Sequence, residues 1–171
     1  MLQNESIYLR VIEESDVANI QCWHNDYDTT KYTTLTSFTP RNFDEEQDWY
    51  RRKLTDGTSR IFMIDEKETA ETVGFVSYSN LDYRNQKALL SIVIGNTDFR
   101  GKGIATQAIQ LLEDLLKNEF NVRKVTVQVL SNNDSSLSLF ERSGYMEEGI
   151  LKKEIYRNGK FHDLHLLSKF I

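Results

Sequence analysis

The stretch IVIGNTDFRGKGIATQAIQLLEDLL, from Ile92 to Leu116, joins an apolar run to an Arg-Gly-Lys-Gly turn and then to a segment with helical periodicity. Its apolar residues recur at the spacing of one helix face, which predicts a helix over about 102–118. The first N–H groups of a helix have no intrahelical partners, and Gly101 and Gly103 leave this backbone open to close approach. This helix end therefore suits a phosphate or pyrophosphate, although the glycines could equally serve only a tight turn.

Two other phosphate-binding loops do not match this turn. The sequence GKGIAT lacks the four-residue gap and the Lys-Ser/Thr pair of a P-loop, so Lys102 is not placed to reach terminal phosphates. A dinucleotide fingerprint requires a third glycine where Thr106 stands and an acid at the end of the next strand. That strand closes with Leu130-Ser131-Asn132-Asn133, so the dinucleotide reading also fails.

The composition of the chain argues against several classes of protein. Its 171 residues include 21 Lys and Arg against 26 Asp and Glu, a formal net charge of −5, so a nucleic-acid-binding surface is not expected. Cys22 has no second cysteine to pair with, and together with three histidines it shows no zinc-ligand spacing. The sequence shows no basic leader and no long apolar window. We therefore expect a reduced, metal-free, cytoplasmic protein without a membrane segment.

The rest of the chain predicts a single α/β domain over residues 1–171. Alternating apolar runs separated by polar turns indicate an antiparallel meander over about 60–95. The polar, threonine-rich segment that contains Pro40 is predicted to be a loop. Strands are expected at about 7–12, 60–65, 72–79, 87–95, 124–130, 145–156 and 161–170. Helices are expected from a cap at Ser15-Asp16, and at about 44–54, 102–118 and 134–143.

Four stretches, in matching order along the chain, resemble one family. Arg100-Gly101-Lys102-Gly103-Ile104-Ala105 follows the pattern Arg/Gln-x-x-Gly-x-Gly/Ala, and NNDSSLSLFERSGY resembles Asn-x-x-Ala-x-x-Leu-Tyr-Glu-x-x-Gly-Phe. The opening WHNDYDTTKY and the closing NGKFHDLHLLSKF complete the set. Together they resemble the GNAT superfamily of acetyl-CoA-dependent N-acetyltransferases, in the branch of the ribosomal-protein N-terminal and spermidine acetyltransferases. The resemblance implies an α/β fold with a mixed, mostly antiparallel sheet of six to seven strands, about four flanking helices and a splayed central strand pair.

The resemblance also implies that acetyl-CoA is the co-substrate. The N–H groups of 101–106 would cradle its pyrophosphate, and the backbone of 92–94 would pair with the pantetheine arm like an added strand. Asn133 would bond the pantetheine, and it equally suits an N-terminal helix cap. The cofactor-binding residues implied in this way are Ile92, Val93, Ile94, Arg100, Gly101, Lys102, Gly103, Ile104, Ala105, Thr106, Asn133 and Phe140.

For the chemistry, the resemblance implies direct attack of the amine on the thioester, with the backbone N–H of Ile94 polarising the carbonyl. Phe140 stands where many family members carry a tyrosine that protonates the departing thiolate. His24 and His162 could carry protons, but we favour structural or substrate-edge roles for both. The groups that could replace the missing tyrosine are Tyr145, which we take as the candidate catalytic residue, Tyr78, Tyr83 or a water molecule.

We therefore expect an N-acetyltransferase for a primary amine of a small molecule, such as an aminosugar, or of a protein N-terminus. The segment KYTTLTSFTP has no carboxylate to meet a polycation, so polyamines are less favoured acceptors. The helix at 44–54 and the loop before it form the predicted amine-side wall. The alternative, motivated by Phe140, is a CoA-binding pseudoenzyme or sensor. No nucleic-acid, membrane or metal partner is expected, and a homodimer is left open. The predicted substrate residues are Tyr32, Thr34 and Tyr78.

Overall fold

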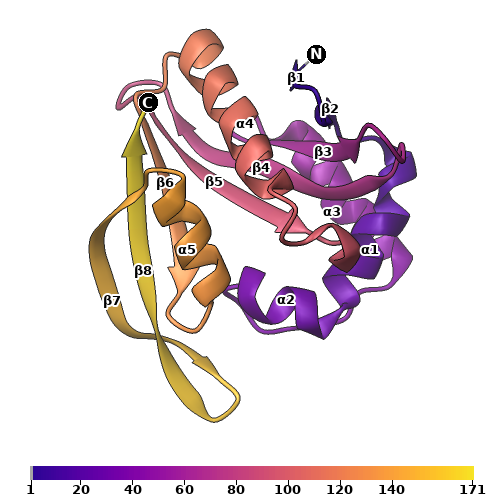
Figure 1. Cartoon of the computed structure of the whole chain (residues 1–171). Coiled ribbons are helices and arrows are strands. Elements are labelled where there is room, and N and C mark those ends of the chain that lie inside the picture. Colours follow the sequence, from indigo (N-terminus) through magenta and orange to yellow (C-terminus); the bar gives the residue numbers. More distant parts are fainter. Residues whose placement is uncertain (1) are drawn as a thin grey trace.

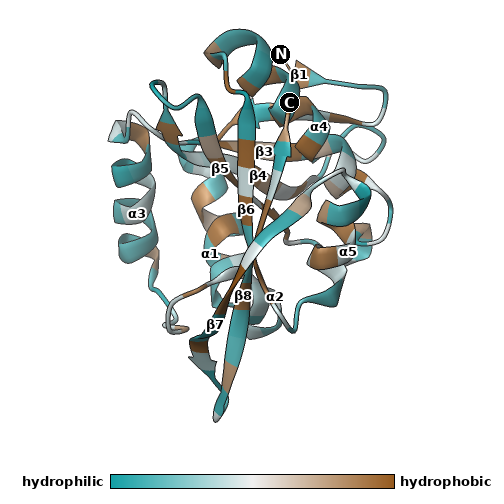
Figure 2. Cartoon of the chain, turned by 90° about the vertical axis from the view of Figure 1, so that its left-hand side faces the viewer, coloured by the Kyte–Doolittle hydropathy of each residue, from teal (hydrophilic) through white to brown (hydrophobic). Residues whose placement is uncertain are grey.

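The computed structural model describes residues 2–171 and shows one mixed sheet with helices on both faces (Figures 1 and 2). Within these residues the sheet has eight strands in the order β1-β2-β3-β4-β5-β6-β8-β7. The strands are β1 (Leu2–Gln3), β2 (Ile7–Val11), β3 (Arg60–Glu66), β4 (Thr72–Asp82), β5 (Lys87–Ile94), β6 (Lys124–Leu130), β7 (Met146–Arg157) and β8 (Lys160–Phe170). The α-helices are α1 (Val17–Asn25), α2 (Tyr27–Thr33), α3 (Phe43–Thr55), α4 (Ile104–Phe120) and α5 (Asp134–Arg142). Over the same residues, no helix is both long and apolar enough to cross a membrane.

The sheet is antiparallel apart from the junction of β5 and β6, which run parallel. These two strands pair only where Lys87–Leu89 faces Lys124–Thr126. Further along, β5 stays paired with β4 as far as Ile94, whereas β6 stays paired with β8 as far as Leu130. The inner edges of β5 and β6 therefore part, as Figure 1 shows. The predicted splayed central pair is confirmed.

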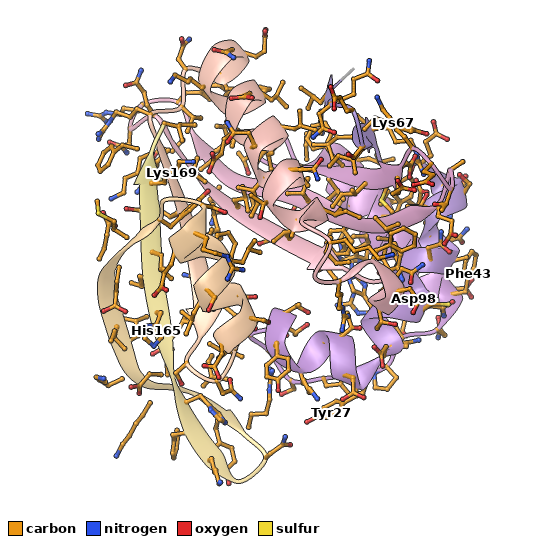
Figure 3. All side chains as sticks on the ribbon, viewed as in Figure 1. Tyr27, Phe43, Lys67, Asp98, His165 and Lys169 are labelled. Atoms are coloured by element: carbon orange, nitrogen blue, oxygen red, sulfur yellow. The ribbon has the colours of Figure 1, made fainter. Side chains whose placement is uncertain are left out.

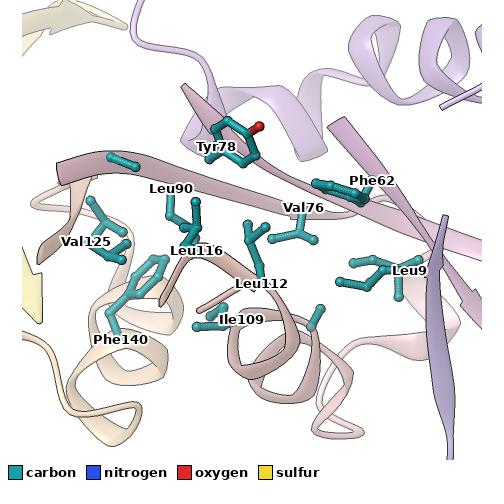
Figure 4. Packing of buried hydrophobic residues seen from close by; sticks show 14 of the residues in the cluster. Leu9, Phe62, Val76, Tyr78, Leu90, Ile109, Leu112, Leu116, Val125 and Phe140 are labelled. Carbon is teal, nitrogen blue, oxygen red and sulfur yellow. The ribbon is translucent and has the colours of Figure 1, made fainter. Parts of the chain in front are cut away.

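The larger hydrophobic core lies between the sheet and α4. Ile109, Leu112 and Leu116 of the helix are almost completely buried and pack toward Val76 and Leu90 of the strands (Figure 4). Burial of each such side chain contributes about 1.5–3 kcal/mol. Because neighbouring residues of a strand point to opposite faces, a second cluster forms on the other side, under α1 and α3. This second cluster consists of Ile12, Ile20, Ile61, Met63 and Phe75.

Three details differ from the prediction. Helix α4 begins at Ile104, two residues later than expected, because Gly103 has a left-handed φ of 78° and cannot be its first helical residue. Helix α2 occupies part of the predicted loop. Threonine has low helix propensity, but Asp26 caps α2 by accepting hydrogen bonds from the N–H groups of Asp28 and Thr29. Strand β1 is only two residues long and was not predicted, so the structure has one strand and one helix more than expected.

Candidate active site

The parted ends of β5 and β6 lie beside a cleft of about 470 Å³, here named the α4 cleft. Its walls are the end of β5, the turn into α4 with the first residues of that helix, one side of α5 and parts of α2. Ten of the twelve predicted cofactor residues line it. These are Ile92, Val93, Ile94, Arg100, Gly101, Gly103, Ile104, Ala105, Thr106 and Asn133.

The start of α4 is left open toward this cleft. Gly103 is the N-cap residue and no side chain caps the helix, whereas α2, α3 and α5 are capped by Asp26, Asn42 and Asn133. Gly101 also has a positive φ, of 74°, which shapes the turn. The first N–H groups of α4 therefore have no helix or cap partner. This arrangement fits the pyrophosphate of CoA, because a hydrogen bond to a charged group contributes about 1.5–3 kcal/mol.

Arg100 joins two walls of the α4 cleft. Its Nε donates to the carbonyl of Ile94 at 3.0 Å, and its Nη2 donates to Oγ1 of Thr29 at 2.9 Å. The Thr29 hydroxyl in turn donates to Asp26, and this bond holds the pKa of that carboxyl below its usual value. The end of β5 is thereby tied to the first turn of α2.

Asn133 has the capping role that its sequence position suggested, and it also lies at the cleft. Its Oδ1 accepts a hydrogen bond from the N–H of Ser136 at 3.2 Å, which caps α5. The residue is buried but lines the α4 cleft. Its side-chain amide is therefore fixed in orientation by the helix that it caps.

Two predicted cofactor residues, Lys102 and Phe140, lie outside the lining of the α4 cleft. The ammonium of Lys102 lies over the ring of Phe99, 4.7 Å from its centroid. Phe140 is in the main core, where its ring packs edge-on against Tyr145 at 5.1 Å between centroids. The position of Phe140 does not support its predicted contact with the cofactor, because its apolar ring is buried in the core between α4 and the sheet.

The position of Tyr145 argues against its predicted role as the replacement acid. Tyr145 is 3% exposed, and its hydroxyl donates to Glu113 at 2.8 Å. Burial, together with the Glu113 carboxylate, raises the pKa of Tyr145. Glu113 also accepts a hydrogen bond from Lys169 at 2.6 Å. Tyr145 therefore belongs to a buried structural network.

We expect Tyr145→Phe to retain wild-type turnover while lowering the free energy of unfolding by about 1–2 kcal/mol, because Glu113 keeps Lys169 but loses one hydrogen bond. Urea denaturation and acetyl-CoA-dependent thiol release measure the two quantities. A fall in turnover of about 100-fold or more, at unchanged acetyl-CoA affinity, would restore Tyr145 as the acid.

A second cavity, of about 220 Å³ and here named the α3 cavity, adjoins the first. The two share Thr29, Thr33 and Val93 in their linings. The α3 cavity is also lined by Trp49 and Lys53 of α3, the helix of the predicted amine-side wall.

The three predicted substrate residues divide between the two spaces. Thr34 lines the α3 cavity, but Tyr32 lines the α4 cleft instead. Tyr78 is in the lining of the α3 cavity, yet its ring is buried against Phe62 and Phe120, and burial raises the pKa of its hydroxyl. The hydroxyl of Tyr78 is therefore poorly placed to exchange a proton with a substrate.

His24 lies in the α3 cavity lining, whereas His162 is in neither lining. The partner of His24 is Glu46, a residue that sequence reasoning did not single out. A signal for it was present. Glu46 shares one helical face with Trp49, Tyr50 and Lys53, at intervals of three, four and seven residues.

The two parted central strands, the uncapped helix N-terminus at the opening and the second cavity alongside are the arrangement that the resemblance implies for an acyl-CoA-dependent transferase. The chain belongs to the acetyltransferase (GNAT) domain family, which matches residues 6–146. It is thus a GNAT-type N-acetyltransferase, and its co-substrate is acetyl-CoA.

The chain is similar to several proteins of known or proposed activity. It is 26% identical to the spermidine N(1)-acetyltransferase of Vibrio cholerae serotype O1, over 98% of this chain and 97% of that protein. It is 36% identical to a putative ribosomal N-acetyltransferase of Bacillus subtilis, over 53% of this chain and 49% of that protein. Among solved structures, the Vibrio cholerae spermidine N-acetyltransferase in complex with CoA and spermine matches with a TM-score of 0.90 and 25% identity, over 98% of this chain and 96% of that one.

These matches confirm the predicted superfamily and branch. A homologue from Vibrio cholerae is dodecameric. The predicted alternative of a pseudoenzyme gains no support from these comparisons, because the relatives described here are acetyltransferases or proposed to be so.

Proposed function

We propose that the chain acetylates a primary amine of an aminosugar or of a protein N-terminus, with acetyl-CoA in the α4 cleft and the acceptor in the α3 cavity. The observation that carries this proposal is that the α4 cleft and the α3 cavity share part of their linings. Thr29, Thr33 and Val93 line both, so a thioester and an amine can meet at the end of β5. Holding the two reactants together would supply much of the catalysis, without a covalent enzyme intermediate.

In this proposal the pyrophosphate binds the open N-terminus of α4, and the pantetheine arm follows the free edge of β5. The side chain of Arg100 donates a hydrogen bond to the carbonyl of Ile94. Pantetheine can pair with that carbonyl only if the Arg100 side chain turns away. The backbone N–H of Ile94 stays our candidate for polarising the thioester carbonyl. Lys102 contributes through its backbone rather than its ammonium, which lies over Phe99.

The lining of the α3 cavity supports the choice of acceptor class. It carries hydroxyl groups from Thr30, Thr34, Ser59, Ser77, Ser79 and Ser91, and within the described residues it includes Lys53 but no Asp or Glu. Hydroxyl groups suit a sugar or a peptide backbone. A polyamine would bring several positive charges to a lysine with no carboxylate to receive them. Spermidine is nevertheless the second candidate acceptor, because it is the named substrate of a relative that covers nearly the whole chain.

An acceptor panel tests this function. Thiol release from acetyl-CoA is measured with glucosamine, with a peptide that has a free N-terminus and with spermidine. We expect turnover with glucosamine or the peptide to exceed that with spermidine. Turnover confined to spermidine would refute the proposed acceptor class, and no turnover with any of the three, despite acetyl-CoA binding, would refute the function. The homodimer that the sequence leaves open can be tested by light scattering on the purified chain.

Lys53 should set the preference between these acceptors. We expect Lys53→Glu to lower the KM for spermidine by about tenfold, because a repulsion of roughly 0.7 kcal/mol is replaced by an attraction of about the same size. The control is Arg52→Glu, which makes the same charge change on α3 at an exposed residue outside the cavity lining. Equal effects of the two substitutions would indicate a general effect of net charge instead.

A further inference from the structure

Helices α1 and α3 bring a histidine and a glutamate together at the α3 cavity. His24 lines the cavity, and its Nδ1 lies 2.8 Å from Oε1 of Glu46. Glu46 is fully buried, which is rare for a glutamate, and Nη1 of Arg41 lies 3.5 Å from the same oxygen. A buried carboxylate is tolerated only with such partners. The pair is therefore part of the built interior and not an incidental surface contact.

The imidazole is held in one orientation. It makes edge-to-face contacts with Trp49 at 5.1 Å and with Phe75 at 6.2 Å between ring centroids. Asn25 binds both the C=O and the N–H of Arg41, which fixes the segment that brings the guanidinium to Glu46. The ring thus has aromatic walls and a fixed charge behind it.

The carboxylate decides which ring nitrogen is free. An ionised Glu46 only accepts hydrogen bonds, so Nδ1 of His24 must carry the proton. The guanidinium of Arg41 forms an ion pair with the same oxygen of Glu46, at 3.5 Å. In the neutral ring the lone pair is then on Nε2, and within residues 2–171 the one hydrogen bond of the ring is that of Nδ1. Nε2 is thus the free acceptor of a residue that lines the cavity.

We propose that His24 is a catalytic residue that takes a proton from the acceptor ammonium, and that Glu46 is its positioning residue; this rests on the function proposed above. Nε2 takes one proton from the ammonium, and the free amine attacks the thioester carbonyl to form the C–N bond. The C–S bond breaks with its electron pair on sulfur, and the nitrogen passes its second proton to that thiolate. His24 then releases its proton to solvent, so the products are the amide, the CoA thiol and one proton.

A base at this place meets a chemical need. An alkyl ammonium with a pKa of about 10.4 is free amine in only about one part in 10³ at pH 7. Because the attacking nitrogen itself supplies the proton that sulfur needs, the step works without a tyrosine. This agrees with Phe140 in the core and with Tyr145 bound to Glu113.

The other charges around the cavity favour loss of this proton. Lys53 faces the cavity from α3, Arg41 lies behind Glu46, and the hydroxyl of Tyr78 on β4 is buried. In the part of the chain that the structure describes, the lining has no carboxylate that would hold the substrate in its ammonium form. Positive charges near the acceptor lower the pKa of its ammonium group and so favour the neutral amine.

The test compares His24→Asn with the unmodified enzyme. Asparagine keeps a donor near the position of Nδ1 and removes Nε2. Turnover is measured with glucosamine and with ethylamine and 2,2,2-trifluoroethylamine, two small amines of which only the second is largely unprotonated at neutral pH. We expect turnover with ethylamine to fall by about 10²- to 10⁴-fold, with a smaller fall for glucosamine, whose amine is less basic than an alkyl amine, a much smaller fall for trifluoroethylamine, and unchanged acetyl-CoA affinity by calorimetry. Equal falls for both small amines would indicate a structural role and overturn the proposal.

The control is His165→Asn. His165 forms a similar pair, with Nδ1 2.6 Å from Oε2 of Glu147, but it lies on β8, far across the molecule from Asp98 and Phe43 (Figure 3). We expect the turnover of His165→Asn to stay at the wild-type value. An equal loss of turnover in His165→Asn and His24→Asn would overturn the proposal.

A readout independent of any acceptor is the tautomer of His24, from the ¹⁵N chemical shifts of the imidazole. We expect the Nδ1–H form, and an Nε2–H form would overturn the proposal. If the unmodified enzyme acetylates no amine but shows the Nδ1–H form, the proposed function fails while the arrangement of the pair stands.

Discussion

Replacing Gly103 with glutamate is expected to weaken acetyl-CoA binding by about 100-fold or more, which corresponds to the loss of one or two hydrogen bonds to a charged group. Gly103 is the N-cap of α4, and no side chain occupies the space around it within 4 Å. A glutamate there can fold its carboxylate onto the open N–H groups of the helix, so that it takes the place proposed for the pyrophosphate. Calorimetry with acetyl-CoA measures the loss.

The substitution also strains the backbone, since Gly103 has a φ of 78°. A matched control is Gly159→Glu, in the turn between β7 and β8. Gly159 has a φ of 76° and likewise has no atom within 4 Å of an added Cβ, so strain and charge are nearly the same. We expect both variants to lose similar stability and only Gly103→Glu to lose acetyl-CoA affinity. Normal affinity of Gly103→Glu would mean that the cofactor binds elsewhere.

The cofactor side of the site could be predicted from sequence because it depends on backbone features that are local in the chain. A strand, a turn with two glycines and an amphipathic helix follow each other directly within 92–116. The resemblance then supplied the splayed strand pair, which the limited pairing of β5 with β6 confirms. Ten predicted residues meet in the α4 cleft for this reason.

The acceptor side depends on contacts between distant segments, so its signals in the sequence are weaker. His24 and Glu46 are 22 positions apart and on different helices, so the sequence pattern favoured an edge role for the histidine. Helix α2 was predicted as a loop because of its threonines, although Asp26 was a visible cap. The motif that placed Phe140 and Tyr145 near the cofactor carries no information about which way each ring points, and packing against α4 directs both into the core.

The end of β5 is where the two halves of the site meet, and two glycines set its position. Gly95 leaves room for the indole of Trp23. A Cβ on Gly95 would lie 2.2 Å from that ring, so α1 can approach the strand only because the side chain is absent. On the other side, Gly74 of β4 pairs with Ile94. These contacts fix Val93, which lines both the α4 cleft and the α3 cavity.

Replacing Gly74 with alanine should therefore damage both stability and cofactor binding. The added Cβ would lie 2.2 Å from the carbonyl oxygen of Val93 and 3.0 Å from Cα of Ile94, both backbone atoms that no side-chain rotation can remove. The strand must shift, and we expect the free energy of unfolding to fall by about 3 kcal/mol, the upper range for overpacking. Because the proposed pantetheine edge shifts with it, acetyl-CoA affinity should fall by about tenfold, the equivalent of one lost hydrogen bond.

Urea denaturation and calorimetry measure the two effects, and Gly149→Ala is the matched control. Gly149 is also a strand glycine, in β7, but an added Cβ there has no neighbour within 4 Å. That variant should be as stable as the unmodified protein or slightly more so, since alanine restricts the unfolded chain. If Gly74→Ala behaved like this control, the close approach of β4 to β5 would not be what holds the end of β5 in place. The geometry of the whole site would then have to depend on α1 and Trp23 alone.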